Sequence, residues 1–461
     1  MKGNGVSDSK RLYVGVDVGG TKVLAALVEE TGAVLARERV PTPRDGGPEP
    51  VVAAIEKAVA DVLAKGGVKA ERLTAMGVAI PGVVDPKTAR VVVTPNMSLT
   101  GVAIGPHLEK RFGVPVAIGN DCNFGALGEK WLGSARRFRS VLAMLVGTGI
   151  GGGIVQKGKL WRGAREAAAE VGHIVMQIDG PLCGCGNRGC LEALASRTAI
   201  ERELRAGIAA GRQSILPSFC NGDLSVIRSG AIRRALEADD PLVVEVVRRA
   251  AEILAYACLT IRHLLDPEVI VLGGGVIEAC SEFIVPIVEG IVAADRLPGA
   301  RDGGHVLLSA LGDDAVVLGA VAQARKLIGR SPFKKRFHVM PKYPQLSKAS
   351  FGQITAGEKT YKRDIFISVF GQIKKRDKNL AKETCGDSHV VGPKELEKVC
   401  RGGPEVLFIG AGNEGRLTLS DDGRRFLRQR SIQCEILPTP KLVEAYNKSP
   451  QRKASLIHVT C

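Results

Sequence analysis

The stretch "YVGVDVGGTKVLAALV" (residues 13–28) decides the fold. An apolar run leads into a turn at Gly19-Gly20, and a second apolar run follows, which is typical of two strands joined by a glycine turn. The same pattern returns in "VLAMLVGTGIGGGIVQKGKL" (residues 141–160). Two copies of one pattern within a chain of 461 residues predict two structurally related halves.

Expected strands alternate with expected helices around these two copies. Strands are predicted in "EVIVLGGG" (268–275) and "HVLLSAL" (305–311). Helices are predicted over Pro50–Lys65, Leu194–Gly207, Pro241–Leu265 and Ala315–Leu327, and from Val276 onward. This alternation predicts an α/β architecture, in which ligands bind at the ends of the strands.

The alternation stops at "GRSPFKKRFHVMPKYPQLSK" (329–348), which has three prolines and a cluster of basic residues. We therefore divide the chain into a unit at 1–328, a basic linker at 329–348 and a small α/β unit at 349–461. Charge supports this division, because residues 331–461 hold 25 Lys and Arg against 13 Asp and Glu. Short elements are expected there, as strands at Asp364–Phe370, Glu405–Gly410 and Gln433–Leu437 and helices at Pro393–Cys400 and Asp421–Arg430.

The composition is that of a globular protein, with 45% hydrophobic and 24% charged residues. No apolar run approaches the roughly 18–20 residues that span a bilayer. The first residues, "MKGNGVSDSKR", lack the apolar segment of a signal peptide. We expect a cytoplasmic protein without a membrane partner, whose 11 cysteines serve as thiols or metal ligands.

Glycine-rich turns follow three of the expected strands. "DVGGTK" (17–22) and "GTGIGGG" (147–153) each join two strands, and "LGGGV" (272–276) ends another. Glycines let backbone N–H groups approach phosphate oxygens, and the hydroxyls of Thr21 and Thr148 add donors. Asp17 could hold Mg²⁺ through water. Each turn alone could be a plain hairpin turn, but the set of three favours nucleotide binding.

The segment "IGNDCN" (118–123) places a carboxylate at a strand end. Phosphoryl transfer to an alcohol needs one base near the attacking hydroxyl. Asp121 fits that base, and Asn120 fits a group that orients the hydroxyl. The alternative is an Asx turn or a helix N-cap, which this short segment taken by itself favours over a base.

Three cysteines fall within "CGCGNRGC" (183–190), with "EVGH" (170–173) before them and "LE" (191–192) after them. Together with His173 they make a closed set of four ligands for a structural Zn²⁺ in the loop 173–190. Free thiols are the alternative, and a reducing compartment disfavours a disulfide. Glu170, His173 and Glu192 could hydrogen-bond to a polyol.

Seven motifs in order resemble the ROK family of bacterial sugar kinases, within the hexokinase–actin superfamily: "DVGGTK", "IPGVVD", "TPN", "GNDCN", "GTGIGGG", "EVGH" and "CGCGNRGCLE". The resemblance implies two α/β lobes with a ribonuclease-H-like core that close on ATP and a hexose. It implies Asp121 as the catalytic base and Zn²⁺ on His173, Cys183, Cys185 and Cys190. The implied sugar-binding residues are Asn96, Asn120, Asp121, Glu170, His173 and Glu192. The implied phosphate-binding and ATP-binding residues are Asp17, Gly19, Gly20, Thr21, Lys22, Gly147, Thr148, Gly149, Gly151, Gly273, Gly274 and Gly275.

The resemblance also bears on the substrate. "IPGVVD" is similar to glucokinase members, which implies that glucose is phosphorylated at its 6-hydroxyl by ATP and Mg²⁺. N-acetylglucosamine, N-acetylmannosamine or fructose as acceptor, and polyphosphate as donor, stay open. Ala169 departs from the family, which usually has glycine before the sugar-binding glutamate. Family members are commonly dimers or tetramers, so we expect a homo-oligomer.

Repressors of the same family place a helix-turn-helix before the kinase core. The first expected strand begins at about Leu12, which leaves no room for one and favours an enzyme. A sugar-sensing regulator whose basic C-terminal unit contacts nucleic acid is the alternative of another class. No RNA-binding or zinc-finger motif accompanies that charge, so nucleic acid is not an expected partner.

Residues 349–461 resemble a small α/β domain family that includes a mitochondrial complex I assembly factor and an adipogenesis-associated protein. The motifs are "FGQITAGEKTYKRDIFIS", "PEVLFIGAGNEGRLTLS", "ILPTPKLVEAYN" and "LIHVTC". This resemblance implies a fold more than an activity, and any partner of this unit is unknown. "GAGNEG" (410–415) imitates a dinucleotide loop, but "RLTLS" after it is extended where such a loop should open into a helix.

Overall fold

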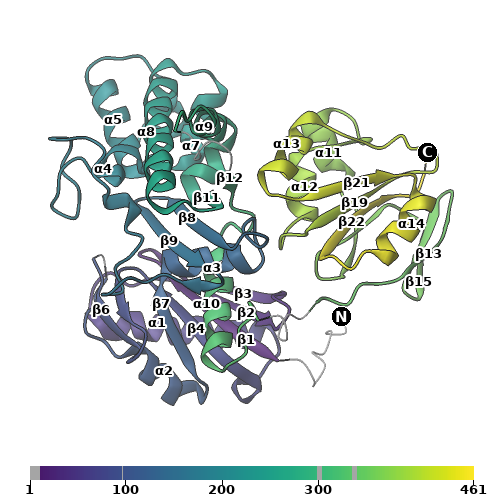
Figure 1. The fold of residues 1–461 in the computed structure, drawn as a ribbon, viewed down its shortest axis with the longest axis horizontal. Coiled ribbons are helices and arrows are strands. Elements are labelled where there is room, and N and C mark those ends of the chain that lie inside the picture. The colour runs from purple at the N-terminus through teal and green to yellow at the C-terminus, as the bar shows by residue number, and fades with distance from the viewer. Residues whose placement is uncertain (1–10, 96, 298–303, 335–339, 461) are drawn as a thin grey trace.

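The computed structural model describes residues 11–95, 97–297, 304–334 and 340–460 (Figure 1). The first sheet has the strand order β3-β2-β1-β4-β7. β1, β2 and β3 are antiparallel neighbours, and β4 and β7 continue the sheet parallel to β1. The bounds are β1 Leu12–Val18, β2 Lys22–Glu29, β3 Val34–Pro41, β4 Leu73–Ile80 and β7 Val116–Asn120.

The second sheet repeats this plan with the order β10-β9-β8-β11-β12. β8, β9 and β10 are antiparallel, whereas β11 and β12 run parallel to β8. Their bounds are β8 Ser140–Val146, β9 Ile150–Gln156, β10 Lys159–Leu160, β11 Val269–Gly273 and β12 His305–Leu308. The expectation of two related halves is therefore confirmed, because both sheets start from the same strand–glycine turn–strand unit.

Helices cover both sheets. In the first half these are α1 Pro48–Lys65 and α2 Ile104–Phe112, and a small hairpin of β5 Val83–Asp85 and β6 Arg90–Val93 lies beside them. In the second half these are α4 Leu191–Ala195, α5 Arg197–Ala209, α6 Leu216–Phe219, α7 Ser229–Glu237, α8 Pro241–Leu265 and α9 Gly275–Ala293. The single helix expected over 194–207 is two helices, because the Ser196 hydroxyl accepts the N–H of Ala199 and starts α5 with its own N-cap.

Two helices, α3 Asp121–Trp131 and α10 Asp314–Leu327, lie between the halves and pack against each other (Figure 1). They approach so closely that a Cβ on Gly319 would lie 1.6 Å from the backbone oxygen of Phe124. α10 also packs on β1 and β4, while α3 packs on β8 and β9. Because each helix touches strands, and the two helices touch each other, this pair joins the two sheets into one two-lobed body.

The C-terminal unit is a separate small domain rich in β-strands. Its central sheet has the order β17-β16-β22-β19-β21. The bounds are β16 Ile365–Ile367, β17 Ile373–Lys375, β19 Val406–Ala411, β21 Gln433–Leu437 and β22 Lys453–His458. The flanking strands are β13 Leu346–Ser350, β14 Gln353–Ala356, β15 Lys359–Tyr361, β18 Val390–Val391 and β20 Thr418–Leu419. The helices are α11 Lys378–Cys385, α12 Pro393–Val399, α13 Asp421–Gln429 and α14 Thr439–Lys448. The segment after "GAGNEG" enters β20, as the extended pattern predicts, and no helix opens there.

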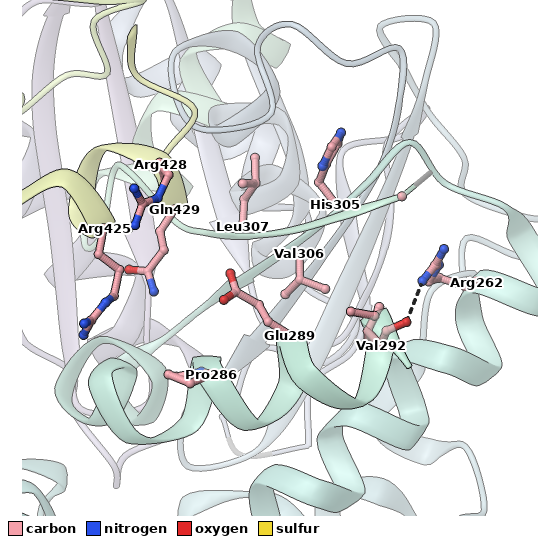
Figure 2. A pocket seen from close by; sticks show the side chains of 12 residues that line it. Arg262, Pro286, Glu289, Val292, His305, Val306, Leu307, Arg425, Arg428 and Gln429 are labelled. Atoms are coloured by element: carbon pink, nitrogen blue, oxygen red, sulfur yellow. Dashed lines mark hydrogen bonds between the residues drawn. The ribbon is translucent and has the colours of Figure 1, made fainter. Parts of the chain in front are cut away.

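The C-terminal unit rests on the two-lobed body through α13 and the loops beside it. The guanidinium of Arg136, just after α3, donates to the backbone oxygens of Pro404 and Ser431 at 2.5 and 3.1 Å. Farther along, Arg425, Arg428 and Gln429 of α13 face Glu289 of α9 across a cavity of about 780 Å³ (Figure 2). Among the described residues, no helix is both long enough and apolar enough to span a bilayer.

Candidate active site

The boundary between β7 and α3 positions Asp121. Asn120 is the N-cap of α3, since its Oδ1 accepts the N–H of Asn123 at 3.0 Å and its Nδ2 donates to the Gly82 oxygen at 3.2 Å. Asp121 is the first helical residue, and its Oδ1 accepts the N–H of Cys122 at 2.8 Å. The capping alternative thus describes Asn120, and this cap leaves the Asp121 carboxylate at the positive end of α3.

A second carboxylate lies beside Asp121. Asp17 is the next-to-last residue of β1. Because β4 lies between β1 and β7 and all three strands are parallel, Asp17 and Asp121 lie at the same edge of the sheet. Burial, and then the neighbouring Asp121, raise the pKa of Asp17 to about 7. Burial also raises the pKa of Asp121, although the bond from the Cys122 N–H opposes the shift. Because two carboxylates lie close together where little water reaches them, binding of a cation or a proton between them is favoured.

The first two glycine turns close tightly at the ends of the two hairpins. The Gly19 N–H donates to the Lys22 oxygen at 2.9 Å, and the Gly147 N–H donates to the Gly149 oxygen at 2.9 Å. A Cβ on Gly20 or Gly147 would meet no atom within 4 Å, so both positions face open space. Such turns leave room for a ligand against the backbone.

The third glycine run lies next to the second turn. β11 pairs with β8 in parallel, so Gly273 and Gly274 come beside the end of β8. Gly274 has φ 88°, and a Cβ there would lie 2.6 Å from the Val146 oxygen. Gly275 then begins α9, whose N-terminus points to the same edge of the sheet. The second and third glycine runs therefore lie next to each other at the same edge of the second sheet.

Ion pairs connect the first glycine turn and β3 to the start of α10. Lys22 Nζ lies 3.5 Å from the Asp313 carboxylate, to which Arg39 also donates at 2.8 Å. Asp313 in turn helps to raise the pKa of Glu278 in the first turn of α9, after the larger effect of burial. Lys22 thus has a carboxylate partner where the sequence predicted a phosphate contact. Asp313 was missed because no sequence motif contains it.

The Glu192 side chain holds the second glycine turn (residues 147–149) in place. Its Oε2 accepts the N–H of Ile150 at 2.8 Å, and a Cβ on Gly149 would lie 2.3 Å from the same oxygen. Two residues from α5 hold the turn as well, since Arg197 donates to the Thr148 hydroxyl and the Thr198 hydroxyl donates to the Thr148 oxygen, both at 2.8 Å. Sequence reasoning missed Arg197 and Thr198, because only the folded chain brings α5 to this turn.

Gly151, predicted to bind phosphate, packs closely against α3. It lies inside β9, and a Cβ on it would be 2.3 Å from the Cys122 sulfur. Its small size is therefore needed for β9 to pack against the first turn of α3. The structure places Gly151 beyond the turn, so the turn itself consists of residues 147–149.

The Cys/His loop gathers its four predicted ligands. The side-chain ligand atoms of His173, Cys183, Cys185 and Cys190 all lie within 4.8 Å of one another. The sulfurs of Cys185 and Cys190 are 3.7 Å apart, and so are the Cys183 sulfur and His173 Nδ1. Tetrahedral zinc with bonds of about 2.3 Å to sulfur separates two thiolates by about 3.8 Å. Burial and the adjacent thiols raise the pKa of Cys190 to about 12, so a bound cation would favour the thiolate of this residue. The donor set and spacing fit Zn²⁺.

The same loop brings the remaining polar residues toward Asp121. Glu170 immediately precedes the short helix Val171–His173. Burial raises the pKa of Glu170, and the charges of His173, Asp121 and Glu192 act on it. The Asp121 and Glu192 carboxylates and the His173 ring thus all lie close enough to Glu170 for their charges to act on it. The predicted sugar ligand Asn96 lies outside the described residues.

Ala169, just before Glu170, has φ 70°, in the left-handed region that disfavours any residue with a Cβ. This backbone explains why the resembling family has glycine here. We expect Ala169→Gly to raise the free energy of unfolding by up to about 1 kcal/mol, the relief of strain exceeding the entropy that glycine adds to the unfolded chain. Urea denaturation followed by circular dichroism measures this. The matched variant Ala168→Gly, at a neighbour without positive φ, should be destabilised instead, and equal shifts in both variants would contradict the assignment.

Comparison with known proteins gives the family of each unit. The model of the ROK family matches residues 13–326, and a model described as a protein of unknown function (DUF498/DUF598) matches residues 346–456. The second match names no activity, so the resemblance of this unit to the assembly-factor family stays a prediction.

Relatives and solved structures cover the first unit. The glucokinase of Thermotoga maritima is 34% identical over 69% of this chain and 99% of its own length. The DNA-binding regulator NagC of Escherichia coli is 28% identical over 70% of this chain and 77% of its own length. The structure of a ROK family glucokinase from Streptomyces griseus, in complex with glucose and AMPPNP, superposes with a TM-score of 0.61 at 34% identity, over 68% of this chain and 99% of that one. With its family model, its relatives and its paired glycine-turn sheets in agreement, the chain belongs to the ROK family.

Proposed function

We propose that the chain transfers the γ-phosphoryl group of ATP to the 6-hydroxyl of a hexose, and that the hexose is glucose. The observation that carries the proposal is the Asp121 carboxylate, which lies at the N-terminus of α3 beside Asp17 and close enough to Glu170, just before the Cys/His loop, for the two charges to interact. The related glucokinase that was solved with glucose and AMPPNP supports the choice of both substrates.

In the proposed reaction Asp121 accepts the proton of the 6-hydroxyl while that oxygen attacks the γ-phosphorus. The new O–P bond forms as the bond from the γ-phosphorus to the β,γ-bridging oxygen breaks, and ADP leaves with that electron pair. The N–H groups of the first two glycine turns donate to phosphate oxygens. Glu170, His173 and Glu192 orient the sugar hydroxyls. Asp17 would hold Mg²⁺ through water, and the ion neutralises charge on the phosphates.

We further propose that Zn²⁺ on His173, Cys183, Cys185 and Cys190 is structural. All four positions are filled by protein, so the ion has no open position for an activated water. Its contribution is to order the loop that presents Glu170 and Glu192. Glu192 is the link, because it lies 3.8 Å from the Cys183 sulfur and also accepts the Ile150 N–H behind the phosphate turn.

A substrate panel tests the proposal with the purified full chain. Release of ADP is followed with glucose, N-acetylglucosamine, N-acetylmannosamine and fructose, each with ATP and with polyphosphate. We expect the highest kcat/KM for glucose with ATP, because "IPGVVD" is similar to glucokinase members. A preference for another acceptor of more than tenfold would reassign the substrate within the same reaction, and no turnover with any pair would overturn the kinase proposal.

A sugar-responsive regulator is the second candidate, favoured by the 28% identity to NagC and by the basic C-terminal unit. The two candidates differ in two measurements. A regulator would retain DNA in a salt-dependent manner, releasing it when sugar is added, and would not turn over ATP. A kinase turns over ATP in the presence of glucose whether or not DNA is present.

A further inference from the structure

A second cavity lies where five segments of the chain meet, one of them the turn between β2 and β3 at Thr31, away from Asp121. Its volume is about 370 Å³, within the range of small-molecule sites of about 300–1,000 Å³. Asp121 begins α3, whereas Lys130 and Trp131 at the other end of the same helix line this cavity, roughly 15 Å farther along the axis. The remaining walls come from the turn between β9 and β10, from residues 332–333 and 340, and from the C-terminal unit.

The lining of this cavity is strongly cationic. Five basic side chains contribute to it, against Glu405 as its single carboxylate among the described lining residues. The five are Lys130, Arg136, Arg139, Lys157 and Arg452. Two further carboxylates act on these side chains. Glu268 lies beside Arg139 and Lys130 and accepts the backbone N–H groups of Arg139 and Ser140, and the charge of Glu129 acts on Arg136. Three carboxylates against five basic side chains leave excess positive charge around the cavity.

Two of these arginines are fixed in place and incompletely paired. Arg136 donates to backbone oxygens of the C-terminal unit, and Arg452 donates to the oxygens of Thr31 and Gly402 at 3.4 Å. The Nε atoms of both arginines are buried and have no acceptor, and Arg452 is only 4% exposed. Burying a donor without an acceptor costs free energy, so the pairing of these two guanidinium groups is incomplete.

Burial also lowers the pKa values of three of these basic side chains. It lowers the pKa of Lys130 to about 8, and lowers those of Arg136 and Arg452 to about 10, with nearby carboxylates opposing the shifts only partly. Cations held together in a poorly hydrated place repel one another. A dianion placed among them removes this repulsion, whereas a neutral ligand does not.

We propose that this cavity binds the phosphate group of a small phosphate-bearing anion, either free phosphate or a phosphate monoester. Phosphate carries close to two negative charges at neutral pH, and its oxygens match the planar fork of arginine. Because Arg136, Lys157 and Arg452 belong to different segments, the anion would hold the end of α3, the β9–β10 turn and the C-terminal unit together. This binding site is separate from the ATP phosphates and does not depend on which sugar is the acceptor.

Calorimetric titration of the full chain tests the proposal, with the active site first saturated by glucose and a non-hydrolysable ATP analogue. Inorganic phosphate and glucose 6-phosphate are the two probes, and citrate is the polycarboxylate control. The test variant is Lys157→Ala with Arg139→Ala, two exposed side chains outside the proposed catalytic groups. Lys159→Ala, from the same hairpin but not lining the cavity, is the matched control.

We expect one phosphate or glucose 6-phosphate site per wild-type chain, and an increase of about tenfold or more in the dissociation constant in the double variant. Lys159→Ala should bind as the wild type does, and unchanged melting temperatures show that the variants are folded. Tighter binding of glucose 6-phosphate than of phosphate identifies a sugar phosphate as the ligand, and equal binding identifies phosphate alone. Absence of saturable binding by both probes, equal weakening in Lys159→Ala, or citrate binding as tight as phosphate overturns the proposal.

Discussion

Replacing Asp121 by asparagine is expected to lower kcat for glucose phosphorylation by about 10²–10⁴-fold, the usual contribution of a positioned general base. The substitution keeps an oxygen that accepts the Cys122 N–H, so α3 should start as before. It removes the group that takes the proton of the 6-hydroxyl. Stopped-flow or coupled measurement of ADP release gives kcat, and equilibrium titration gives the affinity for glucose, which should change much less.

The pH profile separates a base from a residue that only shapes the site. Burial raises the pKa of Asp121 above 3.8, so in the wild type kcat should fall as the pH drops through this raised pKa and the base becomes protonated. The residual activity of Asp121→Asn should lack the contribution of Asp121 to this acidic limb and keep only that of Asp17, whose pKa falls when the neighbouring charge of Asp121 is removed. A variant that retained near-normal kcat, or lost activity while keeping the acidic limb of the wild type, would contradict the assignment of Asp121.

Loss of the proposed zinc is expected to weaken glucose binding by about tenfold or more, because the loop that presents Glu170 and Glu192 would lose its cross-link. Cys185→Ser is the sharpest variant, since Cys185 is exposed, so the substitution leaves the core intact, yet it removes one of the four ligands. Elemental analysis should give one zinc per wild-type chain and much less in the variant. Titration with glucose measures the affinity.

Cys220→Ser is the matched control, because Cys220 is a free thiol of the same lobe that is not part of the Cys/His cluster. It should retain both zinc and glucose affinity. Treatment of the wild type with a chelator should reproduce Cys185→Ser, and readdition of zinc should restore binding. A wild-type chain without bound metal, or a zinc-free chain with undiminished glucose affinity, would contradict the structural role.

Local sequence patterns were sufficient to predict the paired sheets, the helix α8 and the grouping of the Cys/His residues. The repeated strand–glycine turn–strand units predicted the paired sheets, and the helix expected over Pro241–Leu265 has those bounds in α8. The proline at its start and the apolar period along its length are signals within one segment. The ligand set of the Cys/His loop was also predictable, since three of its members fall within eight residues and only His173 lies farther away.

Other features depend on contacts that no segment contains. The segment "GNDCN" alone does not show which residue caps the helix. In the folded chain Asn120 is the N-cap of α3, and Asp121 is the first helical residue. Gly151 matched a phosphate-binding motif, yet its size is set by the Cys122 sulfur of α3. Asp313 has no motif and meets Lys22 only because α10 packs against the first sheet.

The sequence by itself determined the order of strands, turns and helices, and which chemical groups the chain carries. Backbone preference and apolar periodicity act over a few residues, so they are visible in the sequence. Only the tertiary structure decided that Glu192 joins the Cys/His loop to the second glycine turn, and that Lys130, Lys157 and Arg452 line one cavity. These residues meet through close packing of helices and sheets, which depends on side-chain shape over the whole fold and leaves no local pattern in the sequence.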